Sequence, residues 1–209
     1  MQRRNISHFT FARTINHLNY RLAGSIPAAV IRTAREQREQ ELARATSDAP
    51  PEIFSQAVHR IYANYELTID HYLDSATHGP LHLQHPQLAN IVLDALRNYH
   101  QRNKIHLYVA CVMSNHVHIV VGPAEHEESL HLAEFMRLHK GYTAYECNKV
   151  IGKTGQAFWE KNYFDRVVRR GKFSTVMWYV LNNPVKAGLV TTWRDWPGTW
   201  LNPDYDELF

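Results

Sequence analysis

Two closely spaced histidines are the residues of this chain best suited to carry chemistry. His116 and His118 lie in an apolar, β-branched segment, HVHIVVG, that is typical of a strand. Because strand side chains alternate between two faces, both imidazoles point one way, while Val117, Ile119 and Val121 point toward the core. Two imidazoles on one stiff strand can share a single metal ion. Taken alone, however, an HxH pair is more often two surface histidines.

Tyr179 is the candidate nucleophile, and it lies in a helix predicted over residues 172–182. At about 100° per residue the apolar side chains of this helix form one stripe, and Tyr179 falls about 120° from its centre. Asn183, one turn further on, lies on the same flank. The phenol is therefore not needed for the core. Periodicity alone favours a plainer alternative, an edge tyrosine with its hydroxyl in water and Asn183 as a helix cap.

The elements that must position these residues follow an α+β order. Those predicted are a strand over 8–14, helices over 28–46, 52–73 and 86–102, strands over 105–113 and 116–122, a helix over 128–150, a strand or irregular segment over 158–168, and the helix over 172–182. This order matches a ferredoxin-like (split βαβ) antiparallel sheet with packed helices. The same fold class includes RNA-binding modules, so the fold alone does not define a function.

Several details of this arrangement are open to direct comparison with a structure. Only Ser114 and Asn115 separate the two middle strands, which predicts a tight hairpin. The segment 28–77 is either a helical insertion or part of the main fold, within a single domain over 1–209 that ends in a packed tail over 193–209. The inward residues predicted for the helix over 128–150 are Phe135, Leu138, Tyr142 and Tyr145.

Composition narrows the protein class. The chain has 209 residues, 44% of them hydrophobic and 21% charged, as in a soluble globular protein. No apolar run approaches the roughly 20 residues of a spanning helix, and no apolar region follows the first arginines, so no signal peptide is expected. The two cysteines fit neither a disulfide framework nor a zinc ribbon. A bacterial-type cytoplasm, with association to the nucleoid, is the expected location.

Three short runs carry a family resemblance. They are MSNHVHIVV from Met113, FWEKNYFDRVVR from Phe158 and WYVLNNPVKAGLV from Trp178. In this order they resemble the HUH single-tyrosine transposases, and most of all the REP-associated tyrosine transposases and their insertion-sequence relatives. The resemblance covers residues 80–195 and the strand near the start. Ser114 departs from the proline that relatives often carry, which affects the turn and not the ligands.

The resemblance implies roles for particular residues. His116 and His118 match the metal-binding histidines and Tyr179 the nucleophile, while Asn183, where other relatives carry glutamine, completes the metal site. Such enzymes cut single-stranded DNA near a hairpin, form a 5′-phosphotyrosine and a free 3′-hydroxyl, and rejoin strands. Relatives include dimers that exchange the tyrosine helix as well as monomers, so a homodimer is one alternative. The tyrosines that compete for the nucleophile's role are Tyr142, Tyr145 and Tyr163.

The chemistry of strand transfer suits these residue types. A phosphodiester repels nucleophiles, so a divalent cation is needed to neutralise its oxygens. The expected cofactor is Mg²⁺ or Mn²⁺: hard oxygen ligands favour either ion, two imidazoles suit Mn²⁺ somewhat better, and cellular abundance favours Mg²⁺. A phenol has a pKa of about 10, so phenoxide leaves more easily than an alkoxide, and the covalent intermediate is reversible.

Contacts to DNA are predicted for five cations, although the net charge is only +3. Each could equally be a solvated surface charge. Trp159 and Tyr163 could stack on unpaired bases, with core packing the better reading for Trp159. The candidates for backbone phosphate contacts are Lys140, Arg166, Arg169, Arg170 and Lys186.

Two other function classes remain open from the sequence. A domesticated relative could hold hairpin single strands without cutting them, and its hairpin binding would survive Tyr179→Phe. A metal hydrolase of small phosphoesters would turn over generic phosphodiesters and would be indifferent to the loss of Tyr179. The full set of two histidines, a tyrosine and an asparagine argues against pure binding, because a binding module need not keep all four.

Overall fold

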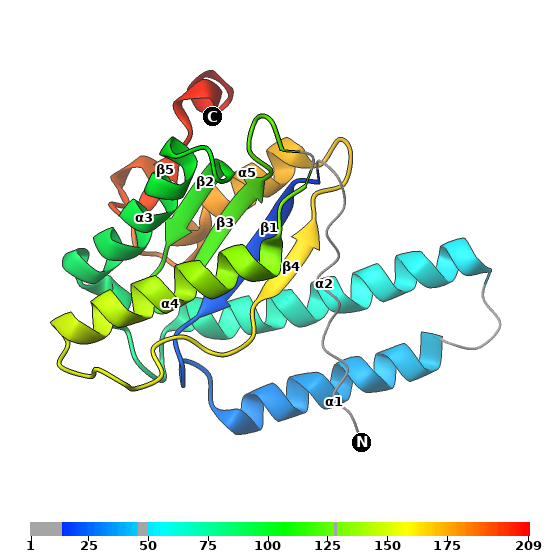
Figure 1. Cartoon of the computed structure of the whole chain (residues 1–209). Helices are drawn as coiled ribbons and strands as arrows, with labels where there is room; N and C mark the ends of the chain where they lie inside the picture. The colour runs from blue at the N-terminus through cyan, green and yellow to red at the C-terminus, as the bar shows by residue number, and fades with distance from the viewer. Residues whose placement is uncertain (1–13, 46–49, 128) are drawn as a thin grey trace. The chain divides into compact units, whose positions relative to one another are not determined.

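The structure is a computed structural model that describes residues 14–45, 50–127 and 129–209. The chain forms two compact units (Figure 1). One contains the described residues up to Ala23 together with His82–Phe209, and the other is Gly24–Leu81. The first holds every residue to which the sequence assigns chemistry.

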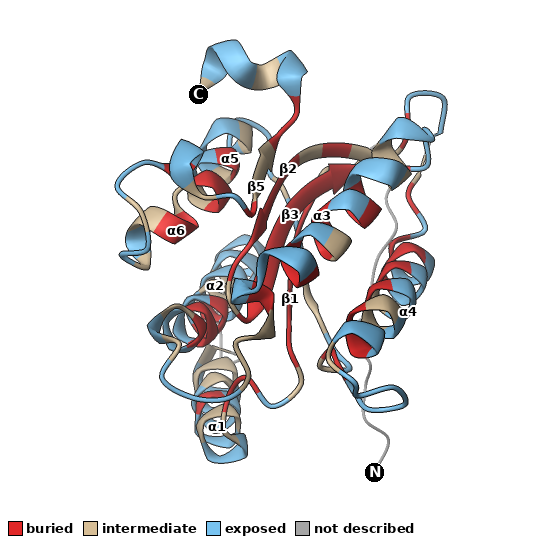
Figure 2. Cartoon of the chain, turned by 90° about the vertical axis from the view of Figure 1, so that its left-hand side faces the viewer, coloured by how far each residue is buried: buried red, intermediate tan, exposed pale blue. Residues whose placement is uncertain are grey.

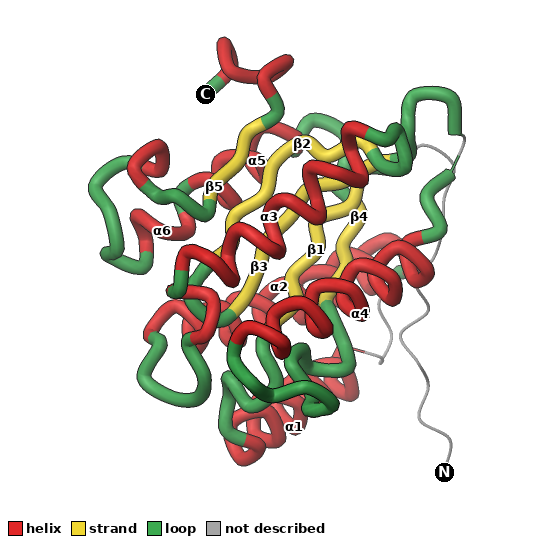
Figure 3. Tube along the Cα trace, turned by 60° about the vertical axis from the view of Figure 1, so that its left-hand side comes forward, coloured by secondary structure: helices red, strands yellow, loops and turns green. Residues whose placement is uncertain are grey.

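A five-stranded antiparallel sheet forms the centre of the first unit. Its strands are β1 (Asn16–Arg21), β2 (His106–Val112), β3 (His116–Gly122), β4 (Phe164–Val167) and β5 (Thr199–Leu201). Their spatial order is β4-β1-β3-β2-β5, which Figure 3 traces across the sheet. The first four strands and the helices that follow β1 and β3 give the ferredoxin-like arrangement, so the predicted fold class is confirmed. β5 extends the sheet beyond β2 and was not predicted.

Helices cover both faces of this sheet. α3 (Pro86–Gln101) and α4 (Leu132–Val150) lie on one face, and α5 (Phe173–Leu181) lies on the other and leads into α6 (Asn183–Lys186) (Figure 1). The central strands between these layers are buried, as Figure 2 shows in red. Short 3₁₀ helices complete the unit, at His82–Gln84, Trp193–Asp195 and Pro203–Leu208.

β3 separates two hydrophobic clusters. Val117, Ile119 and Val121 pack with residues of α3 and α4, as the alternation of a strand predicts. Val120 points the other way and packs against Met177 and the other apolar residues of α5. The same alternation places the two histidines of β3 on the α5 face of the sheet.

The predicted boundaries of the first strand and of the tyrosine helix are among those that differ from the structure. The first strand runs from Asn16 to Arg21, whereas residues 8–13 of the predicted strand lie outside the described residues and Thr14 is not in a strand. α5 ends at Leu181, but Pro184 does not terminate the helical path, because it occupies the first turn of α6, where its missing N–H costs no hydrogen bond. The backbone N–H of Lys186 donates to the carbonyl of Asn182 across this joint.

The inward face predicted for α4 is wrong for three of its four residues. Phe135 is buried, but Leu138, Tyr142 and Tyr145 are between 42% and 56% exposed. The helix begins only at Leu132, and two polar residues, His139 and Thr143, occupy its buried stripe. A search for apolar periodicity passes over such a stripe and selects the neighbouring one.

The second unit is a pair of antiparallel helices, α1 (Ala28–Ala45) and α2 (Pro51–Ser75) (Figure 1). α1 is mostly exposed, as its charged sequence predicts, with Ala34 its buried residue. The Arg38 guanidinium lies over the rings of Tyr62 and Tyr65, at 5.4 and 4.7 Å from their centres. Tyr65 is buried, and Tyr62 is 40% exposed. In the described part of the chain, no helix is both long and apolar enough to cross a membrane.

Candidate active site

The polar sides of β1 and β3 meet on the α5 face of the sheet. In the antiparallel register Asn19 lies opposite His118 and Arg21 opposite His116, so His17 is a diagonal neighbour of His118 on the same face. The imidazoles of His116 and His118 are completely buried, and their ring centres are 4.8 Å apart. The alternative of two surface histidines is therefore wrong.

The ring of His116 is fixed by its neighbour in the hairpin. Its Nδ1 lies 2.7 Å from Oδ1 of Asn115. An amide oxygen can only accept, so the shared hydrogen is on Nδ1, and Nε2 carries the lone pair. Burial lowers the pKa of His116 to about 3. The ring is therefore neutral at physiological pH, which is the state that binds metals.

His118 is held in a similar way by a histidine of β1. Its Nδ1 lies 3.2 Å from Nε2 of His17, and the two rings are stacked with their centres 5.4 Å apart. Nε2 of His118 is buried and has no hydrogen-bond partner among the described residues. Burial, reinforced by the nearby imidazoles and Lys186, lowers the pKa of His118 well below its ordinary value. A buried ring nitrogen without a partner is unusual enough to require an explanation, and a bound cation is one.

Tyr179 lies against this histidine group. Its ring is edge-on to His118 and to His17, with a separation of 5.6 Å between centres in both pairs. On α5 the residues Met177 and Val180 point into the core, and Tyr179 is half-buried beside them, as the predicted stripe requires. The structure thus brings the candidate nucleophile and the candidate ligands together.

The competing tyrosines lie elsewhere. Tyr142 and Tyr145 are exposed on α4, the helix that covers the opposite face of the sheet. Tyr163 is half-buried and lies beneath the ammonium of Lys140, also on α4. The rings that contact His118 are instead those of His116, His17 and Tyr179.

Asn183 is completely buried next to the tyrosine helix. Its Nδ2 donates to the carbonyl of Tyr179 at 2.7 Å, with a longer contact to the carbonyl of Val180 at 3.5 Å. Its Oδ1 is buried and lacks a hydrogen-bond partner among the described residues. The amide thus donates to carbonyls in the last turn of α5, as the cap alternative predicts, while its oxygen is left as an acceptor that a metal ion could use.

The donor atoms fit a divalent cation that prefers oxygen and tolerates imidazole. No group of three or more His, Cys, Asp or Glu side chains in the described residues is arranged to hold a metal ion. The candidate set is instead the two neutral imidazoles of His116 and His118 with the amide oxygen of Asn183. Mg²⁺ and Mn²⁺ accept such mixed sets and keep positions for water and phosphate oxygens.

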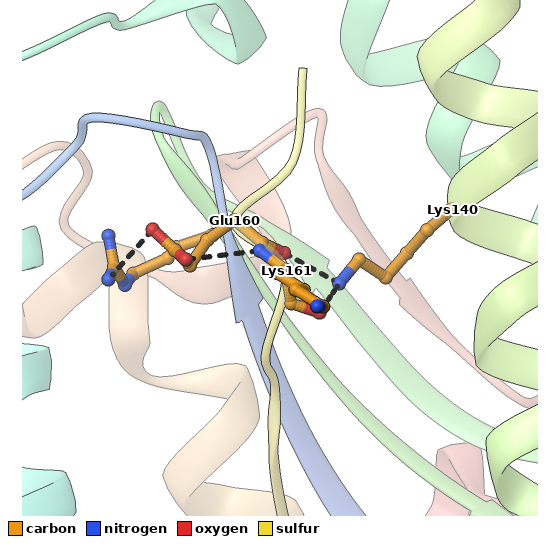
Figure 4. Close-up of polar contacts among 4 residues, drawn as sticks. Lys140, Glu160 and Lys161 are labelled. Carbon is orange, nitrogen blue, oxygen red and sulfur yellow. Dashed lines mark hydrogen bonds and ion pairs between the residues drawn. The ribbon is translucent and has the colours of Figure 1, made fainter. Parts of the chain in front are cut away.

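Lys140 makes contacts that a phosphate-binding lysine would not need. Its ammonium donates to the carbonyls of Glu160 and Lys161, at 2.7 and 3.0 Å (Figure 4). Burial lowers the pKa of Lys140 to about 8. The side-chain carboxylate of Glu160 in turn accepts a hydrogen bond from the guanidinium of Arg21 at 3.3 Å. This network ties the segment before β4 to α4 and to β1, so Lys140 has a structural role.

The remaining predicted DNA contacts are exposed. Arg166 lies on β4, Arg169 and Arg170 lie in the turn before α5, and Lys186 lies at the end of α6. The ammonium of Lys186 is 4.6 Å from the centre of the Tyr179 ring. These four cations therefore stand on the segments that flank the tyrosine helix.

The two aromatic residues considered for base stacking differ in their surroundings. Trp159 is buried, and its Nε1 donates to Oγ1 of Thr143 at 2.9 Å, so core packing is confirmed for it. Tyr163 is half-buried and lines a groove of about 440 Å³ between α4 and residues 156–163. This groove leaves base stacking by Tyr163 sterically feasible.

His17 is the site residue that sequence reasoning missed. The first strand was placed over 8–14, so His17 fell in an unassigned stretch. The signal was nevertheless present: from Asn16 to Leu22, apolar residues at 18, 20 and 22 alternate with polar residues at 17, 19 and 21. That alternation predicts one strand with a polar face and a core face.

Comparison with known proteins supports a family assignment. Residues 82–183 match the model of a family described as "Transposase IS200 like". The matched segment starts where the helical unit ends and includes both histidines, Tyr179 and Asn183. No curated protein matches the chain in sequence.

Two solved structures are similar in part. A REP-associated tyrosine transposase bound to a REP hairpin is 12% identical with a TM-score of 0.49, over 95% of this chain and 82% of that one. A candidate transposase from Deinococcus radiodurans R1 is 14% identical with a TM-score of 0.35, over 88% of this chain and 98% of that one.

Proposed function

Because residues 82–183 match the IS200-like transposase family, we propose that this chain cleaves and rejoins single-stranded DNA near hairpins. Tyr179 is the nucleophile, and His116, His118 and Asn183 hold a Mg²⁺ or Mn²⁺ ion. One observation carries the proposal: the ring of Tyr179 lies edge-on to His118, whose Nε2 is a buried nitrogen without a hydrogen-bond partner in the described residues.

The reaction is a transesterification. The phenolic oxygen of Tyr179 attacks phosphorus and loses its proton to solvent, and the bond from phosphorus to the 3′-oxygen breaks. The products are a 5′-phosphotyrosine and a 3′-hydroxyl, which takes up a proton. A bound divalent ion would neutralise the non-bridging oxygens of the phosphate. The reverse reaction with a different 3′-hydroxyl joins a new strand.

The chain's own residues supply the placement. His116 and His118 present neutral imidazoles from one strand, and the hydrogen bond from Asn183 to the Tyr179 carbonyl keeps amide and phenol on one helical turn. Both imidazoles are completely buried. Entry of a phosphodiester therefore requires the segments that cover them to move, as in many enzymes with closing elements.

The decisive test is covalent. The protein is incubated with single-stranded hairpin DNA and Mg²⁺ or Mn²⁺, and a protein–DNA adduct is sought on denaturing gels. We expect an adduct that is lost in Tyr179→Phe and in His118→Ala but kept in Tyr142→Phe, an exposed tyrosine on the other face. Absence of an adduct across a panel of hairpins, or its persistence in Tyr179→Phe, would overturn the proposal.

A second candidate is a hairpin-binding protein that does not cut. The complete burial of His116 and His118 favours it, because a site that stays closed in this way does not reach a phosphate. This candidate predicts salt-dependent hairpin binding that is unchanged by Tyr179→Phe and His116→Ala, with no cleavage product under any metal condition.

A further inference from the structure

We infer that His17 is a positioning residue of the metal site, which holds His118 in the ring orientation and tautomer that present Nε2 to the ion. The inference rests on the proposed function, because it assumes that His118 binds a metal. His17 touches no reacting atom in this scheme. It acts through its contacts with His118 and Tyr179.

The placement of His17 follows from the sheet. β1 and β3 are antiparallel neighbours with Asn19 opposite His118, so the residue two before Asn19 lies diagonally next to His118 on the same face. The rings of His17 and His118 are within 5° of parallel, and Nε2 of His17 lies 3.2 Å from Nδ1 of His118. Both are buried. Two flat rings stacked with one hydrogen bond between them have little freedom to turn.

The hydrogen bond also constrains the tautomer. A neutral imidazole has one N–H, and a nitrogen that binds a metal must offer a lone pair. If Nε2 of His118 binds the ion, its proton is on Nδ1 and Nε2 of His17 accepts it. His17 therefore works as an acceptor in this place. A histidine ligand whose other nitrogen donates to a fixed acceptor is a better base and a better-oriented ligand.

His17 also contacts the nucleophile. Its ring is edge-on to Tyr179 at 5.6 Å between centres, the same separation as between Tyr179 and His118. The three rings form one packed group, with His17 touching both of the others. A side chain that fills this space without accepting a hydrogen bond would preserve packing but would no longer fix the tautomer of His118. This difference makes the inference testable.

Metal affinity is the measurement that separates a positioning role of His17 from a purely packing role. Mn²⁺ binding is measured by electron paramagnetic resonance on the full chain, with folding checked by circular dichroism. We expect His17→Leu to weaken Mn²⁺ binding by about 10- to 100-fold, the usual effect of removing such a partner. His17→Gln, whose side-chain oxygen can accept, restores affinity to within a few-fold of wild type. If His17→Leu fails to fold, His17→Asn, whose shorter amide does not reach His118, gives the same loss.

A matched control is present on the other side of the sheet. His139 is also completely buried and bonds through Nε2 to the hydroxyl of Tyr20, at 2.6 Å. His139→Leu removes a comparable buried imidazole and leaves Mn²⁺ binding at the wild-type level. A similar loss of Mn²⁺ affinity in His139→Leu and in His17→Leu would show a general structural effect and would overturn the inference.

The outcomes also distinguish this inference from the proposed function. Mn²⁺ binding that His118→Ala abolishes and His17→Leu leaves unchanged overturns only the role of His17. Wild-type protein that binds Mn²⁺ with the expected His17 dependence, but forms no DNA adduct, supports the role of His17 and contradicts strand transfer. Wild-type protein that binds no Mn²⁺ overturns both the metal site and the inference.

Discussion

The ammonium of Lys186 lies 4.6 Å from the centre of the Tyr179 ring. The lysine ends α6, and the tyrosine lies near the end of α5, so the joint between these helices sets their distance. A cation over an aromatic face stabilises the ring by about 0.5–2 kcal/mol. Its positive charge would also attract the phosphate of a DNA strand that reaches the tyrosine.

We therefore expect Lys186→Met to slow adduct formation about tenfold, which corresponds to about 1.4 kcal/mol in the barrier. Quantification of the covalent adduct over time with a hairpin substrate measures this rate. Lys172→Met, which removes an exposed lysine just before α5, is the control and should react at the wild-type rate. Equal rates for Lys186→Met and wild type would contradict a role of this cation at the phenol.

Replacement of Asn183 by aspartate should have opposite effects on thermal stability with and without metal. Asn183→Asp loses the hydrogen bond that Nδ2 donates to the Tyr179 carbonyl, and it buries a carboxylate, so the metal-free protein should unfold at lower temperature. A carboxylate is a stronger ligand for Mn²⁺ than an amide oxygen. Added Mn²⁺ should therefore raise the unfolding temperature of Asn183→Asp by more than that of wild type.

Asn182 provides the matched control for this experiment. Its Nδ2 donates to the carbonyl of Trp178 at 3.0 Å, the same bond one residue earlier. Asn182→Asp should lose a similar bond but gain nothing from Mn²⁺. If both variants respond alike to Mn²⁺ in thermal unfolding, Asn183 is not a ligand.

Stability should fall as the pH falls below neutrality, partly through His139. Burial, reinforced by the charge of Lys140, lowers the pKa of His139 to about 3, from an ordinary value near 6.5. Between these two values the unfolded chain binds a proton that the folded chain does not, so stability is fully present above about pH 6.5 and is lost as the pH falls toward 3. One such group changes the unfolding free energy by up to about 1.4 kcal/mol per pH unit.

The measurement is denaturant unfolding of wild type and His139→Gln at a series of pH values from 7 to 4.5. The variant lacks this titrating group, so its free energy of unfolding should fall less steeply with decreasing pH. An unchanged slope would show that His139 is not buried in its neutral form.

Lys140 should matter for stability more than for DNA binding. Lys140→Ala removes two hydrogen bonds to backbone carbonyls, and we expect a loss of about 1–3 kcal/mol in the free energy of unfolding. Lys161→Ala removes an exposed neighbouring charge and should change stability by less than about 0.5 kcal/mol. Chemical denaturation of both variants tests this, and equal effects would contradict a structural role for Lys140.

The exposed arginines should govern the salt dependence of DNA binding. Each phosphate contact contributes about −0.7 to the slope of log affinity against log salt for single strands. Arg170→Ala should therefore weaken hairpin binding at low salt and reduce the slope by about that amount in fluorescence anisotropy titrations. Arg97→Ala, on α3 over the opposite face and paired with Asp94, is the control. An identical slope in Arg170→Ala and wild type would show that Arg170 does not contact a DNA phosphate.

Some of this arrangement could be predicted from residue patterns alone. β3 was predicted to the residue, because alternation and a two-residue turn define both its bounds and its faces. The orientation of α5 was also predicted, since its apolar stripe is uninterrupted. These two elements carry His116, His118 and Tyr179, but the patterns alone favoured surface histidines and an edge tyrosine, and the roles of the three residues came from the family resemblance.

What escaped prediction was polar but buried. β1 has a polar face that is nevertheless inside the protein, so His17 gave no hydrophobic signal. α4 buries His139 and Thr143, which hydrogen-bond to Tyr20 and Trp159. A pattern that equates burial with apolarity cannot find such residues, because their burial depends on partners far away in the sequence.

The hydrogen bond from Asn183 to the Tyr179 carbonyl has a consequence for control of the enzyme. In the proposed mechanism this bond joins the backbone of the nucleophile to the side chain of a ligand within one helical turn, so the two would move together. A shift of that turn would withdraw nucleophile and ligand in one step, leaving two histidines with a weakly held ion and nothing to attack the strand. The protein could thus be silenced by moving a few residues, without unfolding and without any change in the sheet.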